Sequence, residues 1–324
     1  MDNVNRYLLY LLVFQVLLSA VVFYNFGKLS ASPEPSPLIS IQKADISKII
    51  LKGPSDTSVT LTKKVDSWVL PKEKNFPANN AAVEQLLGRL FDLKEGVQVS
   101  QQETSFARLR VSDKDFERQI MIYKDGELSE VLFFGTAAAL RQTHVRRGGE
   151  TKVFSVKFAA GDIELQSSDW LKRDIFVFPS EHVQEVSIGS IKISNKMVKS
   201  ENAPDNIESS TSQKKQWGIK DLKKNMVPSQ VEINDLVRQL ADIQVSSLAS
   251  PDDIKNIDRS KKPIEFKISL KNNVSHTFKL LKLKNEDDFL LRASSREETF
   301  RMPPLSAKQL VNKAKRDVLT ISKK

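Results

Sequence analysis

The sequence contains no cysteine and little glycine or proline, with 11 and 13 of the latter two among 324 residues. A chain without thiols has no disulfide scaffold, no thiolate metal site and no cysteine nucleophile. The scarcity of glycine and proline excludes collagen-like and linker-dominated architectures. The composition is that of a folded protein, since 40% of the residues are hydrophobic and 28% are charged. At roughly 100–200 residues per domain, the length corresponds to one large domain or two ordinary ones.

Negative charge is also in short supply. Lys and Arg number 50 against 40 Asp and Glu, which gives a net charge of +10. Such an excess favours anionic partners, either nucleic acid or an anionic membrane surface. The basic residues are dispersed, however, and do not alternate with aromatic residues as they do in single-strand nucleic-acid binders. We therefore expect no nucleic-acid partner, and the basic residues form either solvated faces or contacts to an anionic lipid or glycan.

One long apolar run opens the chain. Residues 7–26 carry no charge, and a helix of twenty residues spans about 30 Å, the thickness of the bilayer's hydrocarbon core. A cleaved signal peptide is the alternative, but its apolar region is usually about 7–15 residues long. The best small-x-small cleavage site, Ser30–Ser32, is followed by Pro33, a poor cleavage neighbour. We predict an uncleaved transmembrane anchor.

The anchor determines the expected layout of the chain. Residues 1–6 are predicted to stay in the cytoplasm, as the short basic end of a first span usually does. Residues 27–39 are rich in proline and polar residues and are predicted to form a semi-rigid spacer. Two folded regions follow on the far side of the membrane, residues 40–178 and 180–324.

The two regions repeat one pattern of strands and a helix. In each, three short strand-like runs precede a proline and an amphipathic helix with apolar residues at i, i+3, i+4 and i+7. The helical positions match at an offset of 150, and Trp68 matches Trp217 at 149. We expect both tryptophans in the core against the helix. Asn79 or Asn80 is the expected cap of the first helix, and Ser229-x-x-Glu232 is an expected capping box.

The second half of each region is predicted to be a four-stranded meander followed by a terminal helix. The expected strands cover residues 116–123, 128–134, 142–147 and 151–156, and again 264–270, 275–283, 289–293 and 299–302. Each region ends on a recurring tag, Arg173-Asp174 and Arg316-Asp317. The fold class is therefore α+β, with two duplicated units and antiparallel sheets. Residues 196–215 interrupt the second unit and are predicted to form an exposed, mobile loop.

The order of these features resembles the bacterial domain-of-unknown-function family numbered 4340. The resemblance rests on an anchor, I-x-K-I, V-x-L and x-W-x-L strands, a proline before a V-x-x-L-L-x-x-L-x-x-L helix, and the Arg-Asp tag. It covers residues 46–93 and 142–175, echoed by 183–243 and 289–318. It implies a protein anchored in the bacterial inner membrane with its C-terminal part in the periplasm. Members are often encoded beside ABC-type export systems of the gliding-motility kind, which implies an accessory subunit.

Few residues carry recognisable chemistry, and the resemblance supplies no catalytic residue. The histidines His144, His182 and His276 have no metal-ligand spacing, and we interpret them as structural. The acidic clusters at residues 252–253 and 286–288 lie at expected turns and are interpreted as solvated. The tags are either ion pairs that close each repeat or anion contacts through Arg173 and Arg316, because a guanidinium fits phosphate and carboxylate groups.

We accordingly expect a non-enzymatic protein with no cofactor, catalytic residue or metal. The leading hypothesis is a membrane-anchored periplasmic accessory or scaffold subunit of an ABC-type export system, which binds the transporter's membrane subunits. The alternative is a periplasmic binding module for an anionic lipid or glycan, held between the two repeats. The loop at residues 196–215 is the strongest single candidate for partner contact, since the shared fold does not require it.

Overall fold

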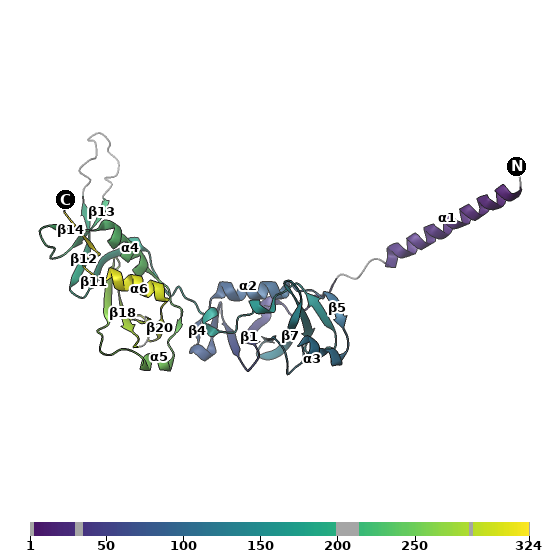
Figure 1. Cartoon of the computed structure of the whole chain (residues 1–324), viewed down its shortest axis with the longest axis horizontal. Helices are drawn as coiled ribbons and strands as arrows, with labels where there is room; N and C mark the ends of the chain where they lie inside the picture. Colours follow the sequence, from purple (N-terminus) through teal and green to yellow (C-terminus); the bar gives the residue numbers. More distant parts are fainter. Residues whose placement is uncertain (1–2, 30–34, 199–213, 285–287, 324) are drawn as a thin grey trace, which may run out of the picture.

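The computed structural model describes residues 3–29, 35–198, 214–284 and 288–323, which form an N-terminal helix and two α+β units (Figure 1). Helix α1 covers Asn3–Leu29, and its stretch Arg6–Tyr24 is long and apolar enough to cross a membrane, with a mean hydropathy of 2.2. None of this stretch is buried in the protein. Its side chains therefore find no apolar cover within the described part of the chain.

The first unit is built on a nine-stranded antiparallel sheet in the order β4-β3-β2-β1-β6-β7-β8-β9-β5. The three-strand run and the four-strand meander predicted from the sequence are both present. The edge strands β4 and β5 are additions that the hydrophobic pattern does not predict. The strands cover Ile46–Lys52 (β1), Ser58–Lys64 (β2), Ser67–Leu70 (β3), Phe76–Pro77 (β4), Val97–Ser100 (β5), Arg118–Lys124 (β6), Glu127–Ala139 (β7), Gln142–Arg147 (β8) and Val153–Val156 (β9).

The second unit is built on an eight-stranded antiparallel sheet in the order β13-β12-β11-β17-β18-β19-β20-β16. Its strands cover Val183–Ile188 (β11), Ile191–Val198 (β12), Lys214–Ile219 (β13), Ser247–Leu248 (β16), Ile264–Leu270 (β17), Ser275–Lys282 (β18), Phe289–Ala293 (β19) and Thr299–Arg301 (β20). Two small ladders complete the fold: Phe176–Val177 (β10) with Asp242–Ile243 (β15), and Met226–Pro228 (β14) with Thr320–Ser322 (β21). The α+β class with antiparallel sheets is thus confirmed.

Amphipathic helices cover each sheet (Figure 1). Helix α2 (Asn80–Phe91) buries Val83, Leu86, Leu87 and Leu90 in the first unit. Helices α4 (Gln230–Ala241) and α6 (Pro304–Lys313) pack on the second. The shorter helical segments are α3 (Phe106–Leu109), α5 (Pro251–Lys255) and the 3-10 turns Lys43–Asp45, Pro71–Glu73, Glu103–Ser105, Ala160–Asp162, Ser167–Asp169 and Ser180–His182.

A tryptophan fixes the main helix in each unit. The Trp68 backbone N–H donates to Asn80 Oδ1 (2.9 Å), and its indole N–H donates to Glu84 Oε1 (3.3 Å). Trp217 makes the same two bonds, to Gln230 Oε1 and Asn234 Oδ1, at 2.8 Å each. Both tryptophans are buried, as predicted. The full superposition of the two units that a duplication requires stays a prediction.

The helix caps also correspond between the units. Asn79 caps α2, and its own N–H donates to Trp170 O (2.7 Å). Ser229 caps α4, and its N–H donates to Leu319 O (2.9 Å). Only half of the predicted capping box forms here. The Glu232 N–H donates to the Ser229 hydroxyl (3.5 Å), but the Glu232 carboxylate binds Lys313 Nζ (2.7 Å) and not the Ser229 N–H. A full capping box does open α5, between Ser250 and Asp253.

Two sequence predictions need correction. The expected terminal helix exists in the second unit as α6, but the first unit has two 3-10 turns in its place, Ala160–Asp162 and Ser167–Asp169. Gly161 and the neighbouring serines disfavour a continuous helix there. The predicted loop at 196–215 is shorter, because its ends continue β12 and β13. The rest of it, residues 199–213, lies outside the described residues.

Aromatic rings join the two units. Phe76 of β4 contacts Phe300 of β20 edge to face, with ring centroids 5.7 Å apart. Phe176, in the connection between the units, contacts Phe300 (5.5 Å) and Phe278 (5.3 Å). Edge-to-face pairs of this kind stabilise by about 0.5–1.5 kcal/mol beyond the area they bury. The two sheets consequently share one contiguous hydrophobic core.

We predict that Leu87→Ala lowers the free energy of unfolding by about 2–4 kcal/mol and Val237→Ala by about 2 kcal/mol, because both side chains are buried beneath their helices. Urea unfolding of the chain without residues 1–30, followed by tryptophan fluorescence, measures both. Val231→Ala on the exposed face of α4 is the control, since its side chain is 75% exposed. Equal effects of Val231→Ala and Val237→Ala would contradict the packing described.

Candidate binding surfaces

The two Arg-Asp tags occupy different places in the fold. Trp170 and Leu319 fill equivalent positions against the helix caps. Arg173 follows the first of these residues in the chain, whereas Arg316 precedes the second. The tags are therefore similar in sequence without being equivalent in structure.

The contacts of the two arginines differ accordingly. Arg173 is half exposed, donates to Ser168 O (3.1 Å) and lies 3.9 Å from the carboxylate of Asp169. Arg316 donates through Nη1 to Asp221 O (3.0 Å). In the described part of the chain neither arginine pairs with the aspartate beside it, and Asp174 and Asp317 are exposed. The predicted ion pair within each tag is thus not formed.

Arg316 lines a cleft of about 700 Å³ at the end of the second unit where β14 pairs with β21. Cationic, acidic, polar and apolar side chains line it: Asp221, Leu222, Lys223, Asn225, Met226, Arg316, Asp317 and Thr320. Lys224, Lys315 and Lys323 are exposed nearby in the chain, so the surroundings of the cleft carry more positive than negative charge. Within the cleft, Arg316 and Lys223 are the groups that could contact an anion, beside the apolar Leu222 and Met226.

Positive charge is concentrated in the unit that contains this cleft. Residues 179–324 hold 27 Lys and Arg against 19 Asp and Glu, so eight of the chain's ten net positive charges lie there. The first unit is nearly neutral by the same count. An anionic surface would therefore attract the second unit more strongly than the first.

A second cleft, of about 640 Å³, lies where the two units meet, the place where the sequence predicts an anionic ligand. It is lined by Lys74 of the first unit and by residues 294–298 of the β19–β20 hairpin. Arg296 lies over the ring of Phe76 (5.3 Å to the centroid) and pairs with Glu298 (3.6 Å). The Arg296 guanidinium is therefore already engaged in contacts at the junction of the units. We interpret this cleft as part of the interface between the units and not as a ligand site.

The acidic clusters converge on one arginine, which the sequence pattern does not reveal. Arg301 of β20 pairs with Asp253 (3.0 Å) and with Asp288 (3.2 Å), which are distant from each other in sequence. Burial alone raises the pKa of Asp253, but the Arg301 and Ser250 hydrogen bonds lower it below its usual value. Asp252 is exposed as predicted, although it lies in the first turn of α5, and residues 286–287 lie outside the described residues.

The three histidines have separate surroundings in the structure. His144 Nδ1 lies 2.9 Å from Thr136 O in the first unit, and His182 is exposed. His276 stacks on Phe178, with ring centroids 5.3 Å apart. Among the described residues no group of three or more His, Asp or Glu is placed to hold a metal ion.

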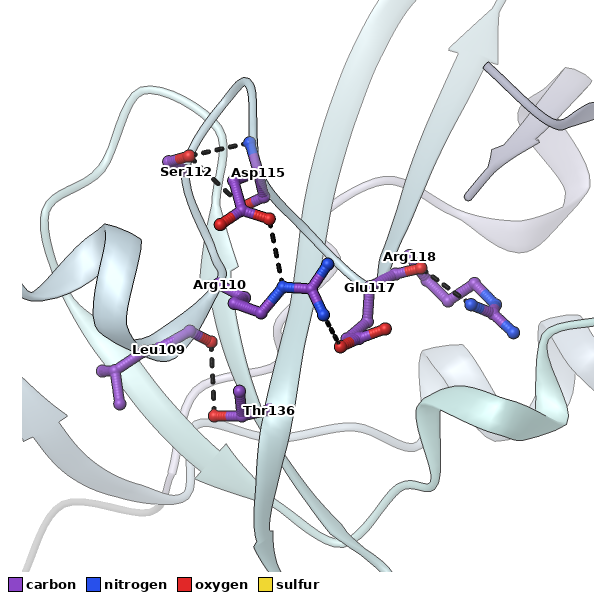
Figure 2. Close-up of polar contacts among 7 residues, drawn as sticks. All are labelled: Leu109, Arg110, Ser112, Asp115, Glu117, Arg118 and Thr136. Atoms are coloured by element: carbon purple, nitrogen blue, oxygen red, sulfur yellow. Dashed lines mark hydrogen bonds and ion pairs between the residues drawn. The ribbon is translucent and has the colours of Figure 1, made fainter. Parts of the chain in front are cut away.

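An arginine network holds the chain that follows β5. Arg110, at positive φ (52°), donates to Asp115 Oδ1 (3.0 Å) and pairs with Glu117 (Figure 2). The hydrogen bond to Asp115 raises the pKa of Arg110 above its usual value. Thr136 of β7 donates to Leu109 O (3.4 Å), which ties the same loop to the sheet (Figure 2). Residues 103–118 are thereby fixed against β7 and β8.

Arg146 of β8 also belongs to this network, and its side chain is buried, with 3% exposed. It donates to Val111 O (2.6 Å) and to Asp113 (2.7 Å). Its guanidinium lies between the rings of Phe106 and Phe133, 4.5 Å from each centroid. In the sequence, Arg146 is visible only as an arginine within a predicted strand. Its contacts in the fold indicate a structural role.

Lys313 joins α6 to α4 through two carboxylates. Its Nζ lies 2.7 Å from Glu232 Oε2 and 2.6 Å from Asp235 Oδ2, and 13% of its side chain is exposed. Burial alone lowers the pKa of Lys313, but the bonds to Asp235 and Glu232 raise it above its usual value. The hydrogen bond from Lys313 in turn lowers the pKa of Asp235.

The chain also matches a known protein family. Residues 68–262, more than half of the chain, match the family described as "Domain of unknown function (DUF4340)", and the chain belongs to that family. The match begins in β3 and ends just before β17, so it includes parts of both units. No curated protein and no solved structure matches the chain.

We predict that Lys313→Met destabilises the protein at pH 7 and that the difference from the wild type shrinks below about pH 4. The stability that comes from a carboxylate with a lowered pKa is present above its unfolded pKa of about 3.9 and is lost as the pH falls through the folded value. Without Lys313, the cause of the lowered pKa of Asp235 is gone. Urea unfolding at pH 7, 5 and 3 measures the difference.

The matched control is Lys255→Met, whose partner Asp252 is on the surface of α5. It is expected to change the free energy of unfolding by less than about 0.5 kcal/mol at each pH. A Lys313→Met effect of constant size from pH 7 to pH 3 would show that the side chain stabilises by packing alone.

Proposed function

We propose that the protein is a membrane-anchored periplasmic accessory subunit of an ABC-type export system and that it binds partner proteins through its surfaces without catalysis. One observation carries the first part. Helix α1 exposes apolar side chains along Arg6–Tyr24, for example Tyr7 at 72% and Phe23 at 80%. A bilayer is the environment that covers such a helix.

The export system is proposed on the basis of the family resemblance. The family resemblance implies genes beside ABC-type exporters, and a protein held at the membrane by one helix is placed to meet the membrane subunits of such a transporter. The two units share one core and extend as an elongated body beyond the spacer (Figure 1). Such a body supports binding over a surface better than binding in one deep pocket.

The anchor gives the first test. We predict that the mature protein keeps Met1 or Asp2 at its N-terminus and resists carbonate extraction of membranes. A helix that serves as a removed signal sequence has the same composition, and N-terminal sequencing separates the two. A mature N-terminus near Ala20 or Pro33 would refute the anchor. Copurification of the full chain with transporter membrane subunits in mild detergent tests the partnership itself.

The Arg316 cleft supports the second candidate function, binding of an anionic lipid or glycan. The cleft places Arg316 and Lys223 beside the apolar Leu222 and Met226, with Asp221 and Asp317 also in its lining, in the unit that holds most of the net positive charge. A basic residue near an anionic lipid surface contributes about 1 kcal/mol. The cleft lies within one unit, so this site differs from the expected one between the repeats.

We predict that Arg316→Gln weakens binding to vesicles of phosphatidylcholine with phosphatidylglycerol about fivefold, the equivalent of about 1 kcal/mol. Flotation of the chain without residues 1–30 measures this, since the anchor then makes no contribution. Arg173→Gln is the control, because Arg173 has the same tag sequence and lines none of the clefts described above. Equal losses for the two variants would show that binding follows net charge and not the cleft.

A further inference from the structure

The four edges of the two large sheets differ in how they are protected. An exposed strand edge pairs readily with another strand, and proteins protect such edges with short strands, prolines and charges. Strand β4 has two residues and ends in Pro77, and β16 has two residues and stops shortly before Pro251. Strand β13 begins with two lysines, Lys214 and Lys215.

Strand β5 has four residues and a register shift between Gln98 and Ser100, but it has neither a charge nor a proline. It pairs with β9 on one side and is the last strand in its sheet. The run from Val97 to Gln102 (VQVSQQ) contains no charge and no proline, in a chain of which 28% is charged. Val97 is 75% exposed and Val99 is 42% exposed. Both are β-branched residues that favour strand pairing, and both are classed as exposed although Val99 is partly covered.

The strand is held rigidly at both of its ends. At Gly96, before it, a Cβ atom would come within 1.9 Å of Ser155 O, so glycine allows the strand to approach β9 this closely. After it, the contacts of Arg110 (Figure 2) and of Arg146 hold residues 103–118. An edge fixed in this way loses little conformational entropy when another strand binds it.

The edge also lies where the chain arrives from the anchor (Figure 1). Leu38 N–H donates to Leu93 O (2.9 Å), and Glu95 N–H donates to Ser36 O (2.8 Å). Arg147 fastens this junction by donating to Leu38 O (2.9 Å). The eight residue steps from Leu29 to Pro37 extend over at most about 29 Å, and the helical residues from Tyr24 to Leu29 add about 8 Å. Pro37 pairs with Lys94, three residues before Val97, so with α1 in the bilayer β5 stays within roughly 45 Å of the membrane surface.

We propose that β5 is a docking edge for an extended, uncharged segment from the periplasmic side of a membrane-embedded partner, which adds as a further strand to the first sheet. The mode is β-strand addition, in which main-chain hydrogen bonds supply affinity and alternate side chains supply specificity. The partner segment would lie within the same reach of its own membrane span, because the tether limits how far β5 can be from the bilayer. This inference rests on the proposed anchored function and names the surface that performs it.

Site-specific crosslinking on the full chain in native membranes tests the proposal. The chain has no cysteine, so Val99→Cys provides one attachment point for a benzophenone maleimide. Leu140→Cys is the matched control, on an apolar side chain of the same unit that is 92% exposed at the tip of a hairpin. We expect the Val99 probe, and not the Leu140 probe, to crosslink to a periplasmic segment adjoining a transmembrane helix of another protein, identified by mass spectrometry.

A charge variant supplies the second readout. The pair Val97→Lys and Val99→Lys protects the edge without touching the core, and we expect it to reduce recovery of that partner about tenfold, with Leu140→Lys without effect. Unchanged unfolding of the double variant in urea shows that the sheet is intact. An adduct of two copies of this chain, an adduct with lipid or a soluble protein, or no adduct would overturn the proposal.

The two proposals fail in distinguishable ways. If the Val99 probe gives no adduct while the wild type still copurifies with the transporter, the proposal of a docking edge is refuted and the proposed accessory function stands. Copurification that survives the double lysine variant unchanged would have the same meaning. A wild-type chain that copurifies with no membrane protein and yields no adduct would overturn both.

Discussion

The contact between Phe76 and Phe300 is the interaction on which the arrangement of the protein depends. Each sheet buries one face beneath its own helix, and neither face alone requires the other unit. The ring of Phe76 at the edge of the first sheet meets Phe300 of the second, with Phe176 packed against Phe300 in turn. All three rings are buried, so the units join through apolar surface and share one core.

This junction leaves the two ends of the body free for different tasks. The first unit holds the incoming chain through Arg147 and presents the unprotected strand β5 beside it. The second unit carries most of the positive charge and the Arg316 cleft. The proposed strand pairing and the proposed anion contact are compatible, because they involve separate elements.

Much of the local structure follows from the sequence because the signals are short-range. The predicted strands at residues 116–123, 128–134 and 264–270 and the predicted amphipathic helix before residue 93 each correspond to an element that the structure contains. The tags mislead because similarity over two residues does not specify their neighbours. The Arg301 network and the half-formed cap at Ser229 are equally hidden, since Asp253, Asp288 and Lys313 reach their partners only after folding.

By itself the sequence determined the apolar helix, the α+β class, the family and the burial of Trp68 and Trp217, because hydrophobic periodicity and composition act locally along the chain. The tertiary structure decided which strands lie at the sheet edges, which arginines are buried and where clefts open. Edge strands such as β5 pair over long sequence separations, and the exposure of Val97 and Val99 exists only once the order of the nine strands is complete. Long-range pairing is not encoded in any single segment.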